Sequence, residues 1–105
     1  MKFEFSPHIA IQIKDYEKAK EFYEKALGME VVTSGEKEAH FKKDGINFYM
    51  ESSEKGNTFF EFKVDDIKEA KKLLEINGCI ITNVYSEKSL MIADPFGMKF
   101  HIWQK

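Results

Sequence analysis

Two segments of similar pattern, HIAIQIKD (residues 8–15) and FFEFKVDD (residues 59–66), decide the fold. Each alternates apolar residues with other residues and ends at an aspartate, which is the pattern of a strand that leads into a helix. The apolar positions are Ile9, Ile11 and Ile13 in the first segment and Phe60, Phe62 and Val64 in the second. Because successive strand side chains point to opposite faces, we expect these positions to pack against a helix. The other face would present functional groups, and two such strands paired by pseudo-symmetry would form the wall of a cavity.

The whole pattern of the first half recurs in the second half. Residues 3–13 are expected to form the first strand, interrupted only by Pro7, with an amphipathic helix from Asp15 to the stop at Gly28. The second helix begins at Asp66. Three strands follow each helix, at 29–33, 38–43 and 46–51 and then at 79–85, 89–93 and 98–103, and Asp44-Gly45 predicts a tight hairpin turn. We therefore predict one α+β domain, residues 1–105, made of two strand–helix–strand–strand–strand copies (about 1–53 and 57–105).

Composition excludes several classes of protein. A chain of 105 residues with a formal charge of −2 and a pI near 5.9 gives no electrostatic reason to expect nucleic acid or an anionic membrane as a partner. The single cysteine, Cys79, excludes an internal disulfide and fits a buried thiol in the cytoplasm. Neither a signal peptide nor a membrane span is expected, because no apolar run approaches the required length.

The order of these elements, together with two short motifs, resembles the vicinal oxygen chelate superfamily of glyoxalases, bleomycin-resistance proteins and extradiol dioxygenases. The motifs are the Phe22-Tyr23…Leu27-Gly28 helix end and the Asp94-Pro95-Phe96-Gly97 turn. The resemblance implies two tandem βαβββ modules whose curved mixed sheets meet around a concave site. It also implies a homodimer, with the site within one chain or across two chains.

In metal-dependent members of that superfamily, each module supplies one ligand from its first strand and one from its last, commonly His and Glu. Matched to this chain, the four places are His8, Tyr49, Phe59 and His101. Phenylalanine cannot bind a metal and neutral tyrosine is a poor ligand, so no metal is favoured. The alternative is a divalent ion (Zn, Ni, Fe or Mn) on His8, His101 and Glu61, a two-histidine-one-carboxylate set.

The remaining candidates lie on the same face of the predicted strands. Tyr49, Phe59 and Trp103 either form an aromatic box for a flat or cationic ligand or simply fill the concavity. Glu61 is either half of a structural ion pair or a pocket acid. Gln12, Glu51 and Lys63 complete the predicted ligand-binding set. His40 is expected at the surface or in a hairpin, and no Ser/His/Asp or Cys/His catalytic spacing is apparent.

Three functions remain open at this point. The first is a metal-free small-molecule-binding protein of the bleomycin-resistance type, with an aromatic-lined cavity. The second is a metal-dependent glyoxalase-like lyase or isomerase, or a dioxygenase-family enzyme, that uses His8 and His101. The third is a metal-free enzyme in which Glu61 moves a proton.

Overall fold

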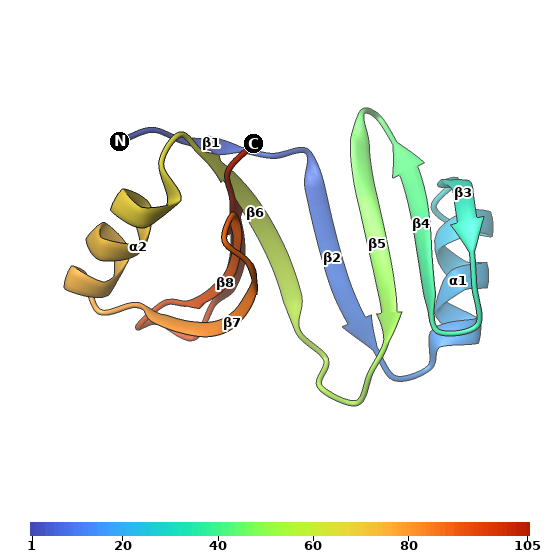
Figure 1. Ribbon diagram of the computed structural model, residues 1–105. Helices are drawn as coiled ribbons and strands as arrows, with labels where there is room; N and C mark the ends of the chain where they lie inside the picture. Colours follow the sequence, from blue (N-terminus) through green and yellow to red (C-terminus); the bar gives the residue numbers. More distant parts are fainter. The chain divides into compact units, whose positions relative to one another are not determined.

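A computed structural model describes residues 1–105 and shows a mixed α+β fold of nine strands and two helices (Figure 1). The chain divides into two compact units. We call Pro7–Thr58 the central unit, and Met1–Ser6 together with Phe59–Lys105 the terminal unit. Each unit has its own core, so each is described by itself.

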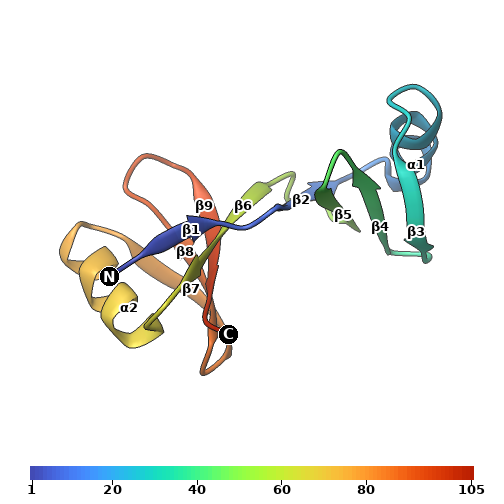
Figure 2. The same cartoon turned by 90° about the horizontal axis from the view of Figure 1, so that it is seen from above.

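The central unit contains β2 (His8–Ile13), α1 (Tyr16–Lys25), β3 (Glu30–Ser34), β4 (Glu38–Lys43) and β5 (Ile46–Ser52). Its strands lie in the order β3-β4-β5-β2, with β2 parallel to β5 and the other pairs antiparallel. Helix α1 covers one face of this sheet, and Figure 2 shows it beside β3. The core between helix and sheet consists of Tyr16, Ala19, Ala39, Phe41, Phe48 and Met50.

The terminal unit contains β1 (Phe3–Phe5), β6 (Thr58–Val64), α2 (Ile67–Ile76), β7 (Ile80–Ser86), β8 (Ser89–Ala93) and β9 (Lys99–Trp103). Its strands lie in the order β7-β8-β9-β6; β6 is parallel to β9, and β1 pairs with β6. The core comprises Val64, Ile67, Ala70, Leu90, Ile92, Phe100 and Ile102. Phe60 and Phe62 pack against this core, as expected from the alternation of apolar residues over positions 59–66.

The segment predicted as one strand over residues 3–13 is two strands in two different units, which corrects that expectation. The Ser6 amide N–H donates to the Glu61 carbonyl (2.9 Å), whereas the Pro7 carbonyl accepts from the Asn47 N–H (2.8 Å). Pro7 has no N–H to continue a ladder, so the chain changes pairing partners at this point. The central unit has the order strand, helix and three strands, and the terminal unit has the same order after the additional strand β1. Tandem modules around a concave site stay a prediction.

Local turn chemistry follows the sequence closely. Asp44 (φ 51°) and Gly45 (φ 80°) form the predicted tight hairpin turn, in which both central residues have positive φ. Asp94 Oδ1 accepts from the N–H groups of Phe96 and Met98 (2.8 and 2.9 Å) and closes the turn before β9. The turn positions were therefore predictable from residue type alone.

Both helices have ten residues. Neither is long and apolar enough to cross a membrane.

Candidate functional site

The polar face of the terminal unit carries a line of three hydrogen-bonded side chains. Glu61 on β6 lies opposite His101 on β9, and Ser89 is on β8, the strand on the other side of β9. His101 Nδ1 is 2.7 Å from Glu61 Oε2, and His101 Nε2 is 2.6 Å from Ser89 Oγ. Tyr85 approaches the same imidazole edge-on, with ring centroids 5.7 Å apart.

The hydrogen-bond partners of His101 determine which of its two ring nitrogens carries the proton. The His101 and Glu61 side chains are only 24% and 17% exposed, so both are half-buried and oriented by their contacts. An ionised carboxylate only accepts hydrogen bonds, so Nδ1–H of a neutral imidazole donates to Glu61. Nε2 is then left to accept from the Ser89 hydroxyl. This geometry suits a proton-accepting imidazole held in one tautomer.

The remaining predicted residues of the terminal unit lie on the same strands. Trp103 Nε1 donates to Ser6 Oγ (3.0 Å), and Lys63 Nζ lies 5.6 Å from the centre of the Trp103 ring. Phe59 is half-buried at the start of β6, where it faces Lys99 on β9. The predicted residues on this face therefore combine a carboxylate and an imidazole with an indole ring, a phenyl ring and a lysine side chain.

The polar face of the central unit carries a stack of three rings. The Tyr49 ring lies between His40 on β4 (centroids 4.5 Å apart, 17° between planes) and His8 on β2 (5.8 Å, 27°). His40 Nε2 is also 2.8 Å from Asn47 Oδ1. His40 was expected at the surface or in a hairpin, and it lies half-buried in the β4–β5 hairpin, where it directly faces Tyr49.

Gln12 and Glu51 lie next to one another on this face. Gln12 Nε2 donates to Glu51 Oε2 over a long 3.4 Å, and Gln12 Oε1 accepts from Asn57 Nδ2 at 2.8 Å. The Gln12 backbone N–H donates to the Asn57 carbonyl (2.8 Å), so the segment between β5 and β6 is held against β2. Gln12 is therefore held in place on two sides.

The nine predicted site residues fall into two groups, one in each unit. The central unit holds His8, Gln12, Tyr49 and Glu51, and the terminal unit holds Phe59, Glu61, Lys63, His101 and Trp103. Sequence reasoning missed His40 and Ser89. The two-residue turn at Asp44-Gly45 fixes which residues of β4 and β5 face each other, so it could have revealed the pairing of His40 with Tyr49. No comparable signal marks Ser89.

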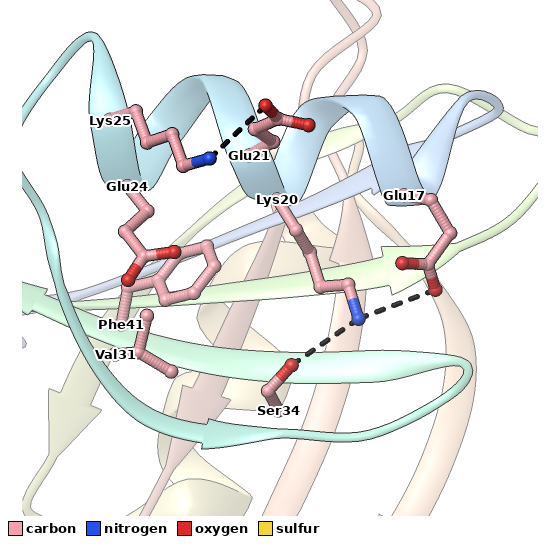
Figure 3. A pocket seen from close by; sticks show the side chains of 8 residues that line it. All are labelled: Glu17, Lys20, Glu21, Glu24, Lys25, Val31, Ser34 and Phe41. Atoms are coloured by element: carbon pink, nitrogen blue, oxygen red, sulfur yellow. Dashed lines mark hydrogen bonds and ion pairs between the residues drawn. The ribbon is translucent and has the colours of Figure 1, made fainter.

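A recess of about 280 Å³ lies between α1 and strands β3 and β4, on the helix side of the central unit (Figure 3). Its lining consists of Glu17, Lys20, Glu21, Glu24, Lys25, Val31, Ser34 and Phe41. Lys20 pairs with Glu17 and Ser34 Oγ, and Lys25 pairs with Glu21, at 3.2–3.3 Å. No predicted site residue lines it, and its charged groups are largely paired with one another, so we assign it no ligand.

The residues of neither unit alone form a ready metal site. No three His, Cys, Asp or Glu side chains are grouped so that they could hold an ion. Both nitrogens of His101 are hydrogen-bonded, and a metal would have to displace Glu61 or Ser89 from one of them. A catalytic zinc site needs about three protein ligands with free donor atoms. Within the terminal unit, His101 and Glu61 alone therefore fall short of the ligand count of such a site.

Cys79 is not part of either group of predicted site residues. Its side chain packs against the core of the terminal unit. Burial raises the pKa of the Cys79 thiol, and the Asp94 carboxylate adds to the effect. Cys79 therefore behaves as a structural thiol rather than as a nucleophile.

Comparison with known proteins places this fold in one family. The family model described as Glyoxalase/Bleomycin resistance protein/Dioxygenase superfamily matches residues 6–102. Among curated proteins, none matches the sequence. A superfamily member from Vibrio splendidus 12B01 has 18% identity and a TM-score of 0.74, covering 99% of this chain and 100% of that one.

Two longer solved structures share the fold. The Mn(II)-bound glyoxalase from Novosphingobium aromaticivorans has 16% identity and a TM-score of 0.74, with 96% of this chain and 38% of that one covered. An H200N variant of homoprotocatechuate 2,3-dioxygenase from B. fuscum has 15% identity and a TM-score of 0.78, with 99% and 33% covered. The chain thus spans little more than a third of either protein. Because the family model covers nearly all of its residues, the chain belongs to the glyoxalase/bleomycin resistance protein/dioxygenase superfamily.

Proposed function

We propose that this protein binds a small molecule without a metal, in an aromatic-lined site on the polar faces of its strands. The ring stack of the central unit carries the proposal. Tyr49 is 38% exposed although it is stacked between His40 and His8, so part of its ring is available to a ligand. Aromatic side chains held in fixed orientations, with a few polar groups beside them, are typical of sites for planar ligands.

The neighbouring polar groups would orient such a ligand. Gln12 and Glu51 offer an amide and a carboxylate beside the ring stack. The terminal unit offers a separate set of groups, in which Phe59 and Trp103 would supply ring contacts to a ligand of that unit. Lys63, Glu61 and His101 would supply charge and hydrogen bonds there. A ligand with a flat ring and at least one polar substituent matches either set.

We also propose that the protein works as a cytoplasmic homodimer. The terminal unit exposes Ile76 (83%), Ile80 (66%) and Phe96 (87%), and exposed apolar groups of this size are commonly covered by a partner. The single cysteine supports a reducing compartment. Light scattering on the purified protein tests the dimer, and a monomer at micromolar concentration would contradict it.

Thermal-shift screening with ring compounds tests the binding proposal. A compound that binds the folded protein raises its thermal unfolding midpoint, and the rise grows with the logarithm of the ligand concentration relative to the dissociation constant. Tyr49→Ala, Phe59→Ala or Trp103→Ala should reduce that shift, whereas Phe22→Ala, an exposed ring on α1, should not. If neither the Tyr49 variant nor the Phe59 and Trp103 variants reduce the shift, the proposed aromatic sites are wrong.

Metal analysis tests the proposal that the protein works without a metal. After dialysis we expect much less than one equivalent of metal per chain, because His101 is occupied by Glu61 and Ser89. About one equivalent of Zn, Ni, Fe or Mn would instead favour a glyoxalase-like lyase or isomerase that uses His8, His101 and Glu61. The structural likeness to an Mn(II)-bound glyoxalase is what keeps that alternative worth testing.

A second candidate function is metal-free proton transfer by Glu61. The 2.7 Å contact between Glu61 and His101 favours it, because a carboxylate and an imidazole in direct contact can exchange a proton with a substrate. Glu61→Gln should then remove turnover while leaving ligand affinity nearly unchanged. Loss of affinity without loss of turnover would contradict it.

A further inference from the structure

Ser89, His101 and Glu61 form a continuous hydrogen-bonded line whose geometry is that of an activated nucleophile. The nucleophilic oxygen lies 2.6 Å from the imidazole, and the imidazole lies 2.7 Å from the carboxylate. A nucleophile within about 2.6–3.2 Å of a base that a third group orients is the general signature of covalent catalysis. The three side chains come from three adjacent strands, β8, β9 and β6, so the backbone ladder fixes their spacing.

The direction of the hydrogen bonds suits proton removal from Ser89. Because Glu61 accepts from Nδ1–H, the lone pair of His101 points from Nε2 toward the serine hydroxyl. The carboxylate also stabilises the imidazolium that forms when the proton arrives. Glu61 is thus a positioning residue, His101 a base and Ser89 a nucleophile.

The position of Ser89 gives it access to a substrate. It is the first residue of β8, directly after the exposed Glu87-Lys88 turn, and its side chain is only half-buried. Ser89 pairs with Trp103, which in turn pairs with Lys63, so a cationic side chain lies in the same row of the sheet. Lys63 therefore adds positive charge to the same face of the sheet, two strands away from Ser89.

We propose that this line is a serine acyl-transfer centre that acts on small carboxylic esters. Ser89 Oγ bonds to the ester carbonyl carbon while its proton passes to His101 Nε2. The bond from that carbon to the leaving oxygen breaks, and the leaving alkoxide takes the proton from Nε2 and departs as an alcohol. Water then attacks the acyl-serine, gives a proton to His101 and releases a carboxylic acid, after which Ser89 recovers its proton.

This inference deepens the proposed function and rests on it in one respect: the terminal unit's polar face must accept a small molecule. It adds a covalent step that a binding protein does not need. The two proposals can therefore fail separately. A ring compound that stabilises both the wild type and Ser89→Ala would support binding whether or not the serine reacts.

A fluorophosphonate probe tests the nucleophile directly. Reaction with Ser89 forms a P–O bond, breaks the P–F bond and releases fluoride together with the serine proton. We expect one adduct per chain by intact mass, mapped to Ser89 by peptide analysis. Ser89→Ala should abolish it, whereas Ser86→Ala should not, because the Ser86 hydroxyl oxygen only accepts from the Lys88 backbone N–H (3.1 Å).

The other two residues have their own expected effects. His101→Gln should slow labelling at least ~100-fold, the usual contribution of a positioned base. Glu61→Gln should slow it as well, and Glu61→Asp should restore part of the rate, which a purely structural carboxylate would not do. Unchanged thermal unfolding midpoints would show that the variants are folded. If one of these variants is destabilised, the labelling rates of wild type and Ser89→Ala decide the outcome instead.

Hydrolysis of p-nitrophenyl acetate provides the second measurement. An acyl-serine intermediate predicts a burst of one p-nitrophenol per chain followed by slower turnover, absent from Ser89→Ala. Folded wild type that gives neither adduct nor burst, or an adduct on any other residue, would overturn the acyl-transfer centre. The same holds if Ser89→Ala reacts as fast as wild type.

Discussion

The imidazole of His40 lies 4.5 Å from the ring of Tyr49 and is nearly parallel to it, at 17°. The two residues face one another across β4 and β5, and His8 lies against Tyr49 from β2. Three rings from three strands thus share one face of the central unit. This contact makes Tyr49 a ring of fixed orientation rather than a mobile surface side chain.

The His40–Tyr49 stack predicts a measurable coupling between the two side chains. Aromatic pairs contribute about 0.5–1.5 kcal/mol beyond the area that they bury. In a double-mutant cycle of His40→Ala and Tyr49→Ala, the free energies of unfolding should therefore deviate from additivity by about that amount. Urea unfolding measures it. Additive effects would mean that the rings do not interact in solution, and His40→Phe should retain much of the coupling.

The two helix-starting aspartates should differ in their contributions to stability. Asp66 accepts a hydrogen bond from the Glu69 N–H (3.1 Å), whereas the Asp15 side chain makes no capping hydrogen bond. Asp66→Ala should lower the free energy of unfolding by about 1 kcal/mol, the usual value of an N-cap. Asp15→Ala is the matched control and should cost clearly less. Equal losses in chemical denaturation would contradict the difference seen between the caps.

Tyr16 should make the stability of the protein depend on alkaline pH. Its hydroxyl donates to the Gly35 carbonyl at 2.7 Å, and burial raises the pKa of Tyr16, with the nearby Lys20 ammonium opposing that rise. A raised pKa means that the folded state holds the phenol proton more tightly than the unfolded state. This stability is fully present below the unfolded pKa of about 10 and is lost as pH rises through the folded value.

The corresponding measurement compares wild type with Tyr16→Phe in urea at neutral and alkaline pH. At neutral pH the variant should lose about 1 kcal/mol for the missing hydrogen bond. The Gly35 carbonyl keeps its contact with Lys20 Nζ (3.1 Å), which limits the loss. Above about pH 10 the gap between the two proteins should shrink. A gap that widens with pH would show that the sign is wrong.

Cys79 should react slowly with thiol reagents while the protein is folded. Burial raises the pKa of its thiol, so the reactive thiolate is scarce near neutral pH. Ellman's reagent should label the native protein much more slowly than the urea-unfolded protein, and Cys79→Ala should give no signal in either state. Equal rates in the two states would contradict the burial of Cys79 against the core.

Much of the fold was predictable from local chemistry. The alternation over residues 59–66 correctly predicted that Phe60 and Phe62 face the core, and the Asp44-Gly45 turn was predicted where positive φ angles are found. Residues 3–13 were predicted as one strand interrupted at Pro7; the interruption is there, but the two sides are separate strands that pair in different units. Proline removes one donor, and which strands lie on either side of it depends on residues distant in sequence.

The candidate site was only partly predictable for the same kind of reason. The alternation of residue types along the strands correctly put Glu61 and His101 on the polar face of β6 and β9. The parallel pairing of these two strands then makes the two residues direct neighbours. Ser89 was not recognised, because a histidine and a serine twelve positions apart meet only when two strands pair in one particular register.

By itself, the sequence determined the element types, the turns, the apolar faces and the family, because these depend on residue chemistry within a few positions along the chain. Only the tertiary structure decided that Ser89 meets His101 and that β1 joins β6. Hydrogen bonds between strands depend on long-range register, and many registers satisfy the same local pattern until the whole core is packed.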